Sequence, residues 1–297
     1  MDIDTRQPVT LLHISDLHFG KHFLPEVGEA LRAKAQALAP NAIVVSGDLT
    51  QRAKPHEFAD ARAFLDSLPK VPQVVVPGNH DVPLYRIWER FFQPHALYQQ
   101  YCNNELDTVL KSEALIIVGL NSTNPYRAVK GGRLSSAQLE FCEHAFANAP
   151  LQTQRVVALH HHLIPAPTFE RTAPMPQAKR ALEVFTRLKV DLIMAGHLHR
   201  AYIGNSLDVY SGKRRDHGII IVQCGTSTSR RGRGLEREKN TFNWLQLSSD
   251  SIEVTHYVYF SNSNDFAPVS RHQFARPQRA YLQERLTDEP QPVEVKP

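Results

Sequence analysis

The chain has 297 residues, of which 42% are hydrophobic and 22% are charged, and its formal net charge is only +4. This composition is that of a globular protein, and it excludes a disordered chain, a fibrous chain and a strongly basic nucleic-acid-binding chain. No apolar run approaches the roughly 20 residues of a membrane-spanning helix, and three widely separated cysteines exclude a disulfide framework or a cysteine zinc site.

The first ten residues lack the basic and apolar regions of a secretory signal. Because disulfides accumulate in exported chains and this chain has few cysteines, we expect a cytoplasmic protein. The most unusual number in the composition is 15 histidines, and their positions carry most of the functional argument.

The first hundred residues alternate between short apolar runs, which predict strands, and amphipathic segments, which predict helices. This alternation is typical of a largely parallel sheet covered by helices. Strands are expected over 9–14, 41–45 and 73–76, with helices over 25–39 and 58–68 between them.

The same alternation continues to about residue 195. Ser135 and Gln138 form a capping-box pair, which predicts the start of a helix over 136–148. Further helices are expected over 84–100 and near 178–189, and further strands over 114–119, 155–159 and 190–195.

The character of the chain changes after residue 217, where apolar runs follow one another without long helices, over 219–223, 242–247 and 252–260. We expect these runs to form a second sheet, mixed or antiparallel. The segment from Pro268 onward is polar, and we expect at most two weak helical turns and a disordered end there. The prediction is one domain over 1–267 and a polar, partly disordered carboxyl-terminal extension over 268–297.

Five groups of chemically active residues stand where predicted strands give way to loops. The carboxyl ends of strands in open α/β sheets form the ligand crevice, so these groups can converge in space. Any one of them is common by chance, whereas all five in order indicate a shared site. In chain order they are Asp16-Leu17-His18, Gly47-Asp48, Gly78-Asn79-His80-Asp81, His160-His161-His162 and Gly196-His197-Leu198-His199.

The donor atoms in these groups are carboxylate oxygens, imidazole nitrogens and one amide oxygen, with no thiolate. That mixture suits borderline or harder divalent ions such as manganese, iron or zinc. The sequence therefore predicts a site for divalent transition-metal ions at the strand ends.

The five groups resemble the motifs of the calcineurin-like metallophosphoesterase superfamily: D-x-H, G-D, G-N-H-[DE], a histidine after a strand, and G-H-x-H. Every motif is intact, and the resemblance covers residues 9–260. It implies an α/β fold, a four-layer αββα sandwich of two mixed sheets, and thus a metallophosphoesterase domain over 1–267.

The resemblance also implies a binuclear centre with two divalent transition-metal ions. One ion would be held by Asp16, His18 and His199, the other by Asn79, His160 and His197, and Asp48 would bridge them. His80 would contact a phosphate oxygen and help to protonate the leaving group. A hydroxide bridging the two ions would attack the phosphorus.

The remaining histidines are assigned by position. The family pattern selects His160 from the triple histidine. We expect His161 and His162 either to support the metal ligands from behind or to be loop residues, and we expect His161 to point away. His13 lies within a predicted strand and is expected in the core. His22, near the first metal loop, faces either the substrate or solvent, and the sequence leaves both open.

The residues that flank the motifs are similar to those of bacterial class III cyclic nucleotide phosphodiesterases and related diesterases. This resemblance implies a phosphodiesterase that hydrolyses a small-molecule, nucleotide-like phosphodiester. The alternatives are a nuclease acting on DNA or RNA ends, for which a capping domain has little room, and a UDP-diacylglucosamine pyrophosphohydrolase-like enzyme, whose apolar insertion is absent. A non-catalytic scaffold is disfavoured because no motif residue is missing.

A basic segment follows the predicted strand 219–223, and residues 200–240 carry 9 basic and 4 acidic residues. Arginine forks suit a second phosphate or a carboxylate on a substrate. Arg230, Arg231 and Arg233 are therefore candidates for substrate binding, and a solvated loop is the alternative.

Overall fold

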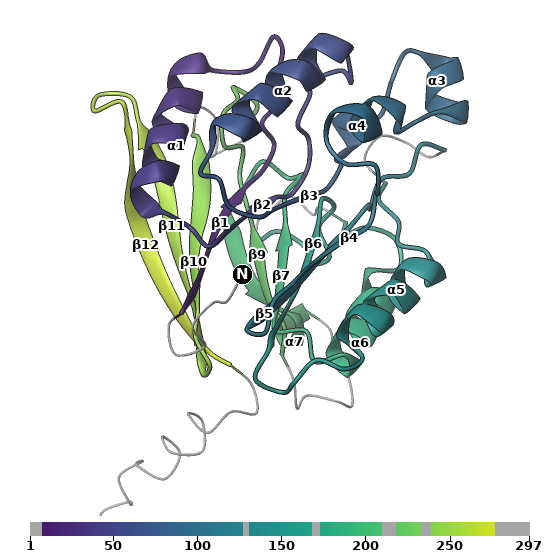
Figure 1. The fold of residues 1–297 in the computed structure, drawn as a ribbon, viewed down its shortest axis with the longest axis vertical. Coiled ribbons are helices and arrows are strands. Elements are labelled where there is room, and N and C mark those ends of the chain that lie inside the picture. Colours follow the sequence, from purple (N-terminus) through teal and green to yellow (C-terminus); the bar gives the residue numbers. More distant parts are fainter. Residues whose placement is uncertain (1–7, 127–130, 168–172, 210–217, 233–238, 277–297) are drawn as a thin grey trace, which may run out of the picture.

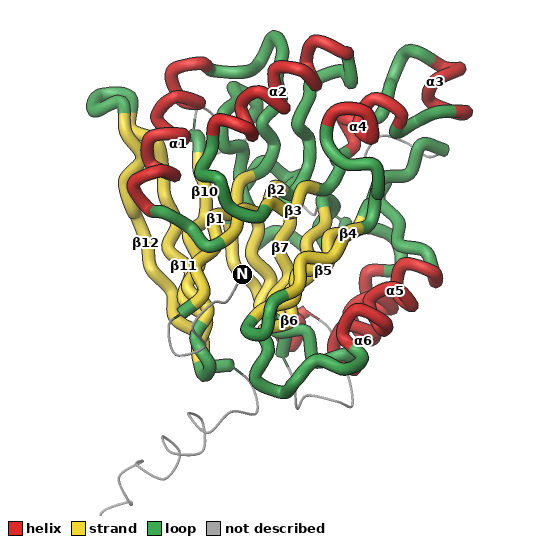
Figure 2. The backbone as a smooth tube through the Cα atoms, viewed as in Figure 1, coloured by secondary structure: helices red, strands yellow, loops and turns green. Residues whose placement is uncertain are grey.

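The computed structural model describes residues 8–126, 131–167, 173–209, 218–232 and 239–276. Two six-stranded sheets pack face to face, and the longer helices lie outside them (Figure 1). Each sheet contains both parallel and antiparallel neighbours, so the predicted αββα sandwich of two mixed sheets is confirmed (Figure 2).

The first sheet is built from the two ends of the described chain. Its strands are β1 (Val9–Ile14), β2 (Ala42–Val45), β3 (Gln73–Val75), β10 (Thr241–Leu247), β11 (Ser251–Phe260) and β12 (Asp265–Ala275). They lie in the order β12-β11-β10-β1-β2-β3. Strands β1, β2 and β3 are parallel, and β10 pairs antiparallel with β1.

The second sheet comes from the middle of the chain. Its strands are β4 (Thr108–Lys111), β5 (Leu115–Leu120), β6 (Gln154–Leu159), β7 (Leu192–Ala195), β8 (Tyr202–Asn205) and β9 (Ile220–Gln223). They lie in the order β4-β5-β6-β7-β9-β8. The central strands β5, β6, β7 and β9 are parallel, and the two edge strands are antiparallel to them.

The helices begin where the sequence supplies helix-starting residues. Pro25 and Pro55 stand in the first turn of two helices, where the missing N–H of proline costs nothing. The predicted capping box is present: Ser135 Oγ accepts the Gln138 N–H, and Gln138 Oε1 accepts the Ser135 N–H. The helices are α1 (Pro25–Leu38), α2 (Pro55–Ser67), the 3-10 turn η1 (Asn79–Asp81), α3 (Ile87–Phe92), α4 (Ala96–Tyr101), α5 (Ser136–Phe146), α6 (Ala178–Arg187) and α7 (Ser206–Val209).

Three hydrophobic clusters account for the layers. One contains Leu31 of α1 and Phe58 of α2 with outer residues of the first sheet, and another joins α5 and α6 to the second sheet. The third lies between the sheets and includes Leu11, Val44 and Ile117. Because alternate strand residues point to opposite faces, each sheet contributes to two of these clusters.

Within the described ranges, no helix has the length and apolar character that are needed to cross a membrane.

The prediction of one helix over 84–100 is wrong. Two short helices, α3 and α4, replace it, and Pro94 lies between them. Proline has no N–H to donate and disfavours helical geometry in the residue before it, so the chain turns there.

The expectation that the late strands form a sheet of their own is also wrong. Strand β9 joins the second sheet beside β7, whereas β10 and β11 extend the first sheet beyond β1. Edge strands β4 and β8 were not anticipated, because each has only four residues and is only partly buried.

The expectation of weak helical turns after Pro268 is wrong as far as Ala275. Strand β12 crosses the predicted boundary after residue 267 and pairs with β11 along its length. It is an edge strand, and the register shifts close to the pairing of Pro268 with Tyr257, which is where a strand tolerates proline. Residues 277–297, the rest of the predicted extension, lie outside the described residues.

Candidate metal centre

The five motifs converge at one edge of the sandwich. Asp16 and His18 follow β1, Asp48 follows β2, and Asn79 lies beyond β3. On the second sheet His160 follows β6, and His197 and His199 follow β7. Parallel strands bring their carboxyl ends to the same edge, so residues far apart in sequence become neighbours.

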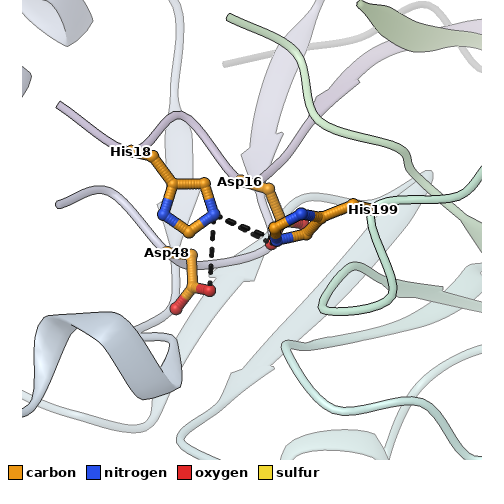
Figure 3. A group of neighbouring side chains, drawn as sticks. All are labelled: Asp16, His18, Asp48 and His199. Atoms are coloured by element: carbon orange, nitrogen blue, oxygen red, sulfur yellow. Dashed lines mark hydrogen bonds and ion pairs between the residues drawn. The ribbon is translucent and has the colours of Figure 1, made fainter. Parts of the chain in front are cut away.

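A first group of donors comprises Asp16, His18, Asp48 and His199 (Figure 3). One ligand atom from each lies within 4.8 Å of the others. His199 Nε2 is 3.1 Å from Asp16 Oδ1 and 3.0 Å from His18 Nε2. All four residues are buried.

A second group of donors comprises Asn79, His160 and His197. Asn79 Oδ1 lies 2.8 Å from His197 Nδ1 and 3.1 Å from His160 Nε2, and these two nitrogens are 3.3 Å apart. Asp48 Oδ2 stands between the groups, 3.4 Å from His160 Nε2 and 3.7 Å from His18 Nε2. The structure thus brings together all seven residues that the sequence predicts as metal ligands.

Hydrogen bonds from behind orient the two outer imidazoles. The Nδ1–H of His160 donates to the Ser46 carbonyl at 2.8 Å, and the Nδ1–H of His199 donates to the Arg231 carbonyl at 2.6 Å. A carbonyl can only accept, so the proton of each neutral ring is on Nδ1. In the neutral form of each ring the Nε2 lone pair then faces the centre, as in metal-binding histidines.

The carboxylate of Asp16 is oriented in the same manner. Its Oδ2 accepts the Ser15 hydroxyl at 2.7 Å and the His197 backbone N–H at 3.0 Å. Its Oδ1 is buried without a hydrogen-bond partner. Buried polar atoms are nearly always paired, so this oxygen requires another partner.

These observations show that the residues fit divalent cations. The unpaired Oδ1 of Asp16 and the facing Nε2 atoms of His18 and His199 are all electron-pair donors. Oxygen and imidazole donors without sulfur suit the harder and borderline divalent ions.

The backbone is strained at five of the seven candidate donor residues. Asp16, His18, Asp48, His197 and His199 have φ values of 52°, 50°, 54°, 74° and 52°. Residues other than glycine adopt this left-handed region at a cost of about 1 kcal/mol or more each. Five strained residues among seven donors indicate that the fold holds the donor geometry against local preference.

Glycines in the motifs allow this close packing. A Cβ on Gly78 would lie 2.2 Å from the backbone nitrogen of Asp48, and a Cβ on Gly196 would lie 2.0 Å from Ser15 Oγ. Both positions therefore exclude a side chain. This explains physically why glycine precedes Asn79 and His197.

The buried carboxylates and imidazoles of the centre shift each other's pKa values. Burial alone would raise the pKa of Asp16 and Asp48, but nearby imidazoles, His199 for Asp16 and His160 for Asp48, hold both well below their usual range. Burial would lower the pKa of His160, but Asp48 raises it to about 9. A proton on His160 thus balances the buried carboxylates, and a bound cation would take over that role with release of the proton.

His80 stands beside the donors. Its Nδ1–H donates to the Gln51 carbonyl at 2.9 Å, and its ring centroid lies 4.9 Å from that of His18. Burial lowers the pKa of His80, and Arg231 lowers it further, while Asp48 opposes the effect. Nε2 is the nitrogen that remains for a ligand.

Asp81 fixes the loops around His80. Its carboxylate accepts the backbone N–H groups of Leu49, Thr50 and Gly78. Burial raises the pKa of Asp81 to about 7. Asp81 belongs to the Gly78–Asp81 motif, from which no role for it could be predicted, and its tertiary contacts show that it joins two motif loops.

The other histidines differ in outcome. His13 is fully buried between Ser46 and Asn243, so its assignment to the core is confirmed. The expectation that His161 points away is wrong, because its ring centroid is 4.7 Å from that of His197 and its Nδ1 contacts Ser122 Oγ. His162 is likewise buried against His197. The rings of His161 and His162 both pack against His197 of the second donor group.

Three of the four residues expected to bind substrate, His22, Arg230 and Arg231, lie in described loops. His22 is half-buried, and its carbonyl accepts the Arg230 N–H at 3.0 Å. Arg231 Nη1 donates to Gln51 Oε1 at 2.9 Å and is 3.4 Å from His80 Nδ1. Arg230 is exposed, and Arg233 lies outside the described residues.

Several residues that support the centre were not anticipated from the sequence. Ser15, Ser46 and Gln51 act through a hydroxyl or a backbone carbonyl. Ser15 and Ser46 directly precede a motif, and Gln51 follows one by three residues. For Ser46 and Gln51 this position is the only sequence signal, because a carbonyl contact is independent of residue type.

A family model described as calcineurin-like phosphoesterase matches residues 9–201. Among curated proteins, a probable cyclic nucleotide phosphodiesterase of Rhodococcus erythropolis is 26% identical over 206 residues, covering 64% of each chain. A cAMP/cGMP dual specificity phosphodiesterase of Mycobacterium tuberculosis is 28% identical over 239 residues, covering 74% of this chain and 72% of that protein. The chain thus matches less than two thirds of the length of the Rhodococcus protein.

Among solved structures, purple acid phosphatase PPD1 from yellow lupin superposes with a TM-score of 0.66 at 14% identity. The match covers 97% of this chain and 57% of that chain. At this identity the likeness shows the fold alone.

Proposed function

Because this chain belongs to the calcineurin-like phosphoesterase family, we propose that it is a metal-dependent phosphodiesterase acting on a small, nucleotide-like phosphodiester. The observation that carries the proposal is the pair of donor groups sharing Asp48, with His80 beside them. Such an arrangement suits the transfer of a phosphoryl group rather than a structural metal site, because it keeps an acid–base residue at the metals.

In this proposal Asp16, His18 and His199 hold one divalent cation, and Asn79, His160 and His197 hold the other, with Asp48 between them. Two cations bound there would neutralise charge on the phosphate and supply an activated water near neutral pH. Manganese, iron and zinc all suit the donors, since none of the donors is a thiolate.

With its Nδ1–H held by the Gln51 carbonyl, His80 would first take up a second proton from solvent at Nε2, favoured by the anionic phosphate, and would then give this proton to the departing alkoxide. The Gln51 carbonyl fixes the ring by accepting its Nδ1–H, so Nε2 keeps one direction. Burial of the donors excludes bulk water and strengthens each charge interaction with the phosphate.

The substrate class is supported by the relatives, whose names state that they act on cyclic nucleotides. The basic side chains Arg52, Arg230 and Arg231 belong to loops joined to His80 and His22, which suits an anionic ligand. We propose a cytoplasmic location as well, on the basis of the low cysteine content.

The test is turnover by the purified chain after chelation and reconstitution with Mn²⁺, Fe²⁺ or Zn²⁺. The substrates are cyclic AMP, bis(p-nitrophenyl) phosphate, the monoester p-nitrophenyl phosphate and single-stranded DNA. We expect a metal to restore diester hydrolysis, with the monoester slower than the diesters. Preference for the monoester or for DNA would overturn the proposed substrate class, and metal-independent turnover would overturn the mechanism.

A further inference from the structure

The segment after His80 exposes several aromatic side chains. Helix α3 has no buried residue, and Trp88 and Phe92 are 78% and 71% exposed. Tyr85, just before this helix, is 75% exposed. Large apolar side chains gathered on a surface indicate a site for a ligand or partner.

Most of these rings already have an aromatic neighbour. Trp88 stacks on Phe92 with centroids 5.4 Å apart, and Phe91 stacks on Tyr126 with centroids 6.0 Å apart. Tyr85 instead lies against Arg52, whose guanidinium carbon is 5.2 Å from the centroid of the ring. One face of Tyr85 is therefore covered by a cation, and the high exposure of the side chain leaves the ring accessible.

Arg52 belongs to the loop that positions His80. The carbonyl of Gln51, the residue before it, accepts the His80 Nδ1–H. The backbone N–H of Arg52 donates to Glu57 Oε2 at 2.7 Å, and Glu57 is buried. The backbone that carries the guanidinium is thus anchored next to the residue proposed to protonate the leaving group.

The segment that carries Tyr85 is tied to the same loop. Arg86 Nη2 donates to the Ala53 carbonyl at 2.7 Å, and Arg86 Nε donates to Glu89 Oε1 at 2.7 Å. Tyr85 and Arg52 are therefore held together by a backbone-anchored contact as well as by their own stacking.

Arg52 adds positive charge to the surroundings of His22. Arg52 forms no ion pair with any acidic side chain in the described part of the chain. His22 shows that the surroundings are basic: burial lowers its pKa, and Arg231, Lys21 and Arg52 lower it further. An uncompensated guanidinium of this kind favours a ligand that combines an anion with a π surface.

From this geometry we propose that Tyr85 and Arg52 form a stacking platform for the nucleobase of the substrate. The inference rests on the proposed function and adds a binding subsite to it. A phosphodiester at His80 extends its sugar and base along the neighbouring loop, and the base lies on the open face of Tyr85. Stacking of this kind accepts any base, since every base has a π face.

The experiment compares two diesters with the same leaving group, thymidine 5′-p-nitrophenyl phosphate and methyl p-nitrophenyl phosphate. Only the first carries a base. We expect Tyr85→Ala to reduce the preference for the thymidine ester, measured as the ratio of the two kcat/KM values, by about five- to a hundredfold. Tyr85→Phe should keep the preference, because it retains the ring.

Trp88→Ala is the matched control, since Trp88 is equally exposed and lies on the adjacent helix. It should leave the preference at the wild-type value. An equal fall for both esters in Tyr85→Ala would make Tyr85 a structural residue and overturn the platform. The same loss of preference in Trp88→Ala would overturn its assignment to Tyr85.

Calorimetric binding of AMP to the same proteins gives a readout that does not depend on turnover. We expect Tyr85→Ala to weaken AMP binding and Trp88→Ala to leave it unchanged. If the protein hydrolyses diesters but Tyr85→Ala binds AMP as tightly as the wild type, the platform is overturned and the proposed function stands. Tyr85-dependent AMP binding without any diester hydrolysis would support the platform and overturn the proposed function.

Discussion

The backbone of His80 orients the carboxylate of Asp48. The His80 N–H donates to Asp48 Oδ1 at 2.7 Å, so that oxygen is occupied. The other oxygen, Oδ2, lies between the Nε2 atoms of His18 and His160. The residue proposed to bridge two cations is thus held by the backbone of the residue proposed to protonate the leaving group, and this contact does not depend on the His80 side chain.

Asp48→Asn should separate orientation from charge. An amide oxygen still accepts the His80 N–H, whereas the negative charge between the two donor groups is lost. Substitution of a residue that only hydrogen-bonds to a metal ligand usually weakens metal affinity or activity 10–100-fold. Asp48 is itself a proposed ligand, so we expect at least about a hundredfold loss of metal affinity and turnover. Metal titration and steady-state kinetics measure both, with exposed Asp60→Asn as the control. Two ions bound with wild-type affinity would contradict the bridging role.

His80→Ala should reduce turnover by about 10²–10⁴ through loss of a proton donor. The loss should be smaller for an aryl diester, whose leaving group needs less protonation. Metal content, measured by elemental analysis, should stay at the wild-type level, and exposed His56→Ala should change neither quantity. Loss of a metal from His80→Ala would assign the residue to the ligands instead.

Arg231 and Arg230 should differ although they are adjacent. The Arg231 guanidinium contacts Gln51 Oε1 and lies near His80 Nδ1, whereas Arg230 is exposed. Arg231→Ala removes a hydrogen bond of a charged group beside His80. A hydrogen bond of this kind contributes about 1.5–3 kcal/mol, so we expect kcat to fall about ten- to a hundredfold. Arg230→Ala should at most raise KM, because it can contact only remote parts of a substrate. Equal effects of the two substitutions on kcat would contradict a specific role for Arg231 and would show that both residues contribute only general positive charge.

Arg276→Met should destabilise the fold by about 3–5 kcal/mol, since it leaves a buried charge without its partner. Arg276 Nε and Nη2 donate to the two oxygens of Asp191 at 2.8 and 2.9 Å, and both residues are buried. The pair joins the end of β12 in the first sheet to the start of β7 in the second. Urea unfolding gives the free energy change. Arg271→Ala, which breaks the pair of an exposed arginine on the same strand with half-buried Glu253, should cost less than about 1 kcal/mol.

His13 should make the fold sensitive to acid. Burial lowers its pKa from 6.5 to about 3, so the unfolded chain binds a proton more readily than the folded chain does. Stability from the neutral ring is therefore complete above pH 6.5 and is lost as the pH falls toward 3. Compared with His13→Gln, the wild type should lose stability more steeply in this window, by up to about 1.4 kcal/mol per pH unit. Parallel curves for the two metal-free proteins, measured by urea unfolding at several pH values, would show that His13 does not titrate on unfolding.

The donor residues could be identified from the sequence because each motif is local. A buried strand followed by Asp-x-His or Gly-His-x-His is visible within a few residues. Strand ends of parallel sheets share an edge, so convergence of the motifs followed without coordinates. The αββα architecture followed in turn from the family resemblance.

What lay beyond the sequence depends on pairing over long distances. Strand β10 pairs with β1, from which it is separated by more than half of the chain. Pro268 is tolerated in β12 because β12 is an edge strand. Gln51 and Ser46 contact the histidines through backbone carbonyls, and the role proposed for Tyr85 depends on its contact with Arg52 from another loop. Local sequence determines which residues can form strands and which can bind a cation, whereas the burial of shared apolar faces decides which strands pair. That pairing sets which backbone groups and side chains surround the donors, and only the tertiary structure contains this information.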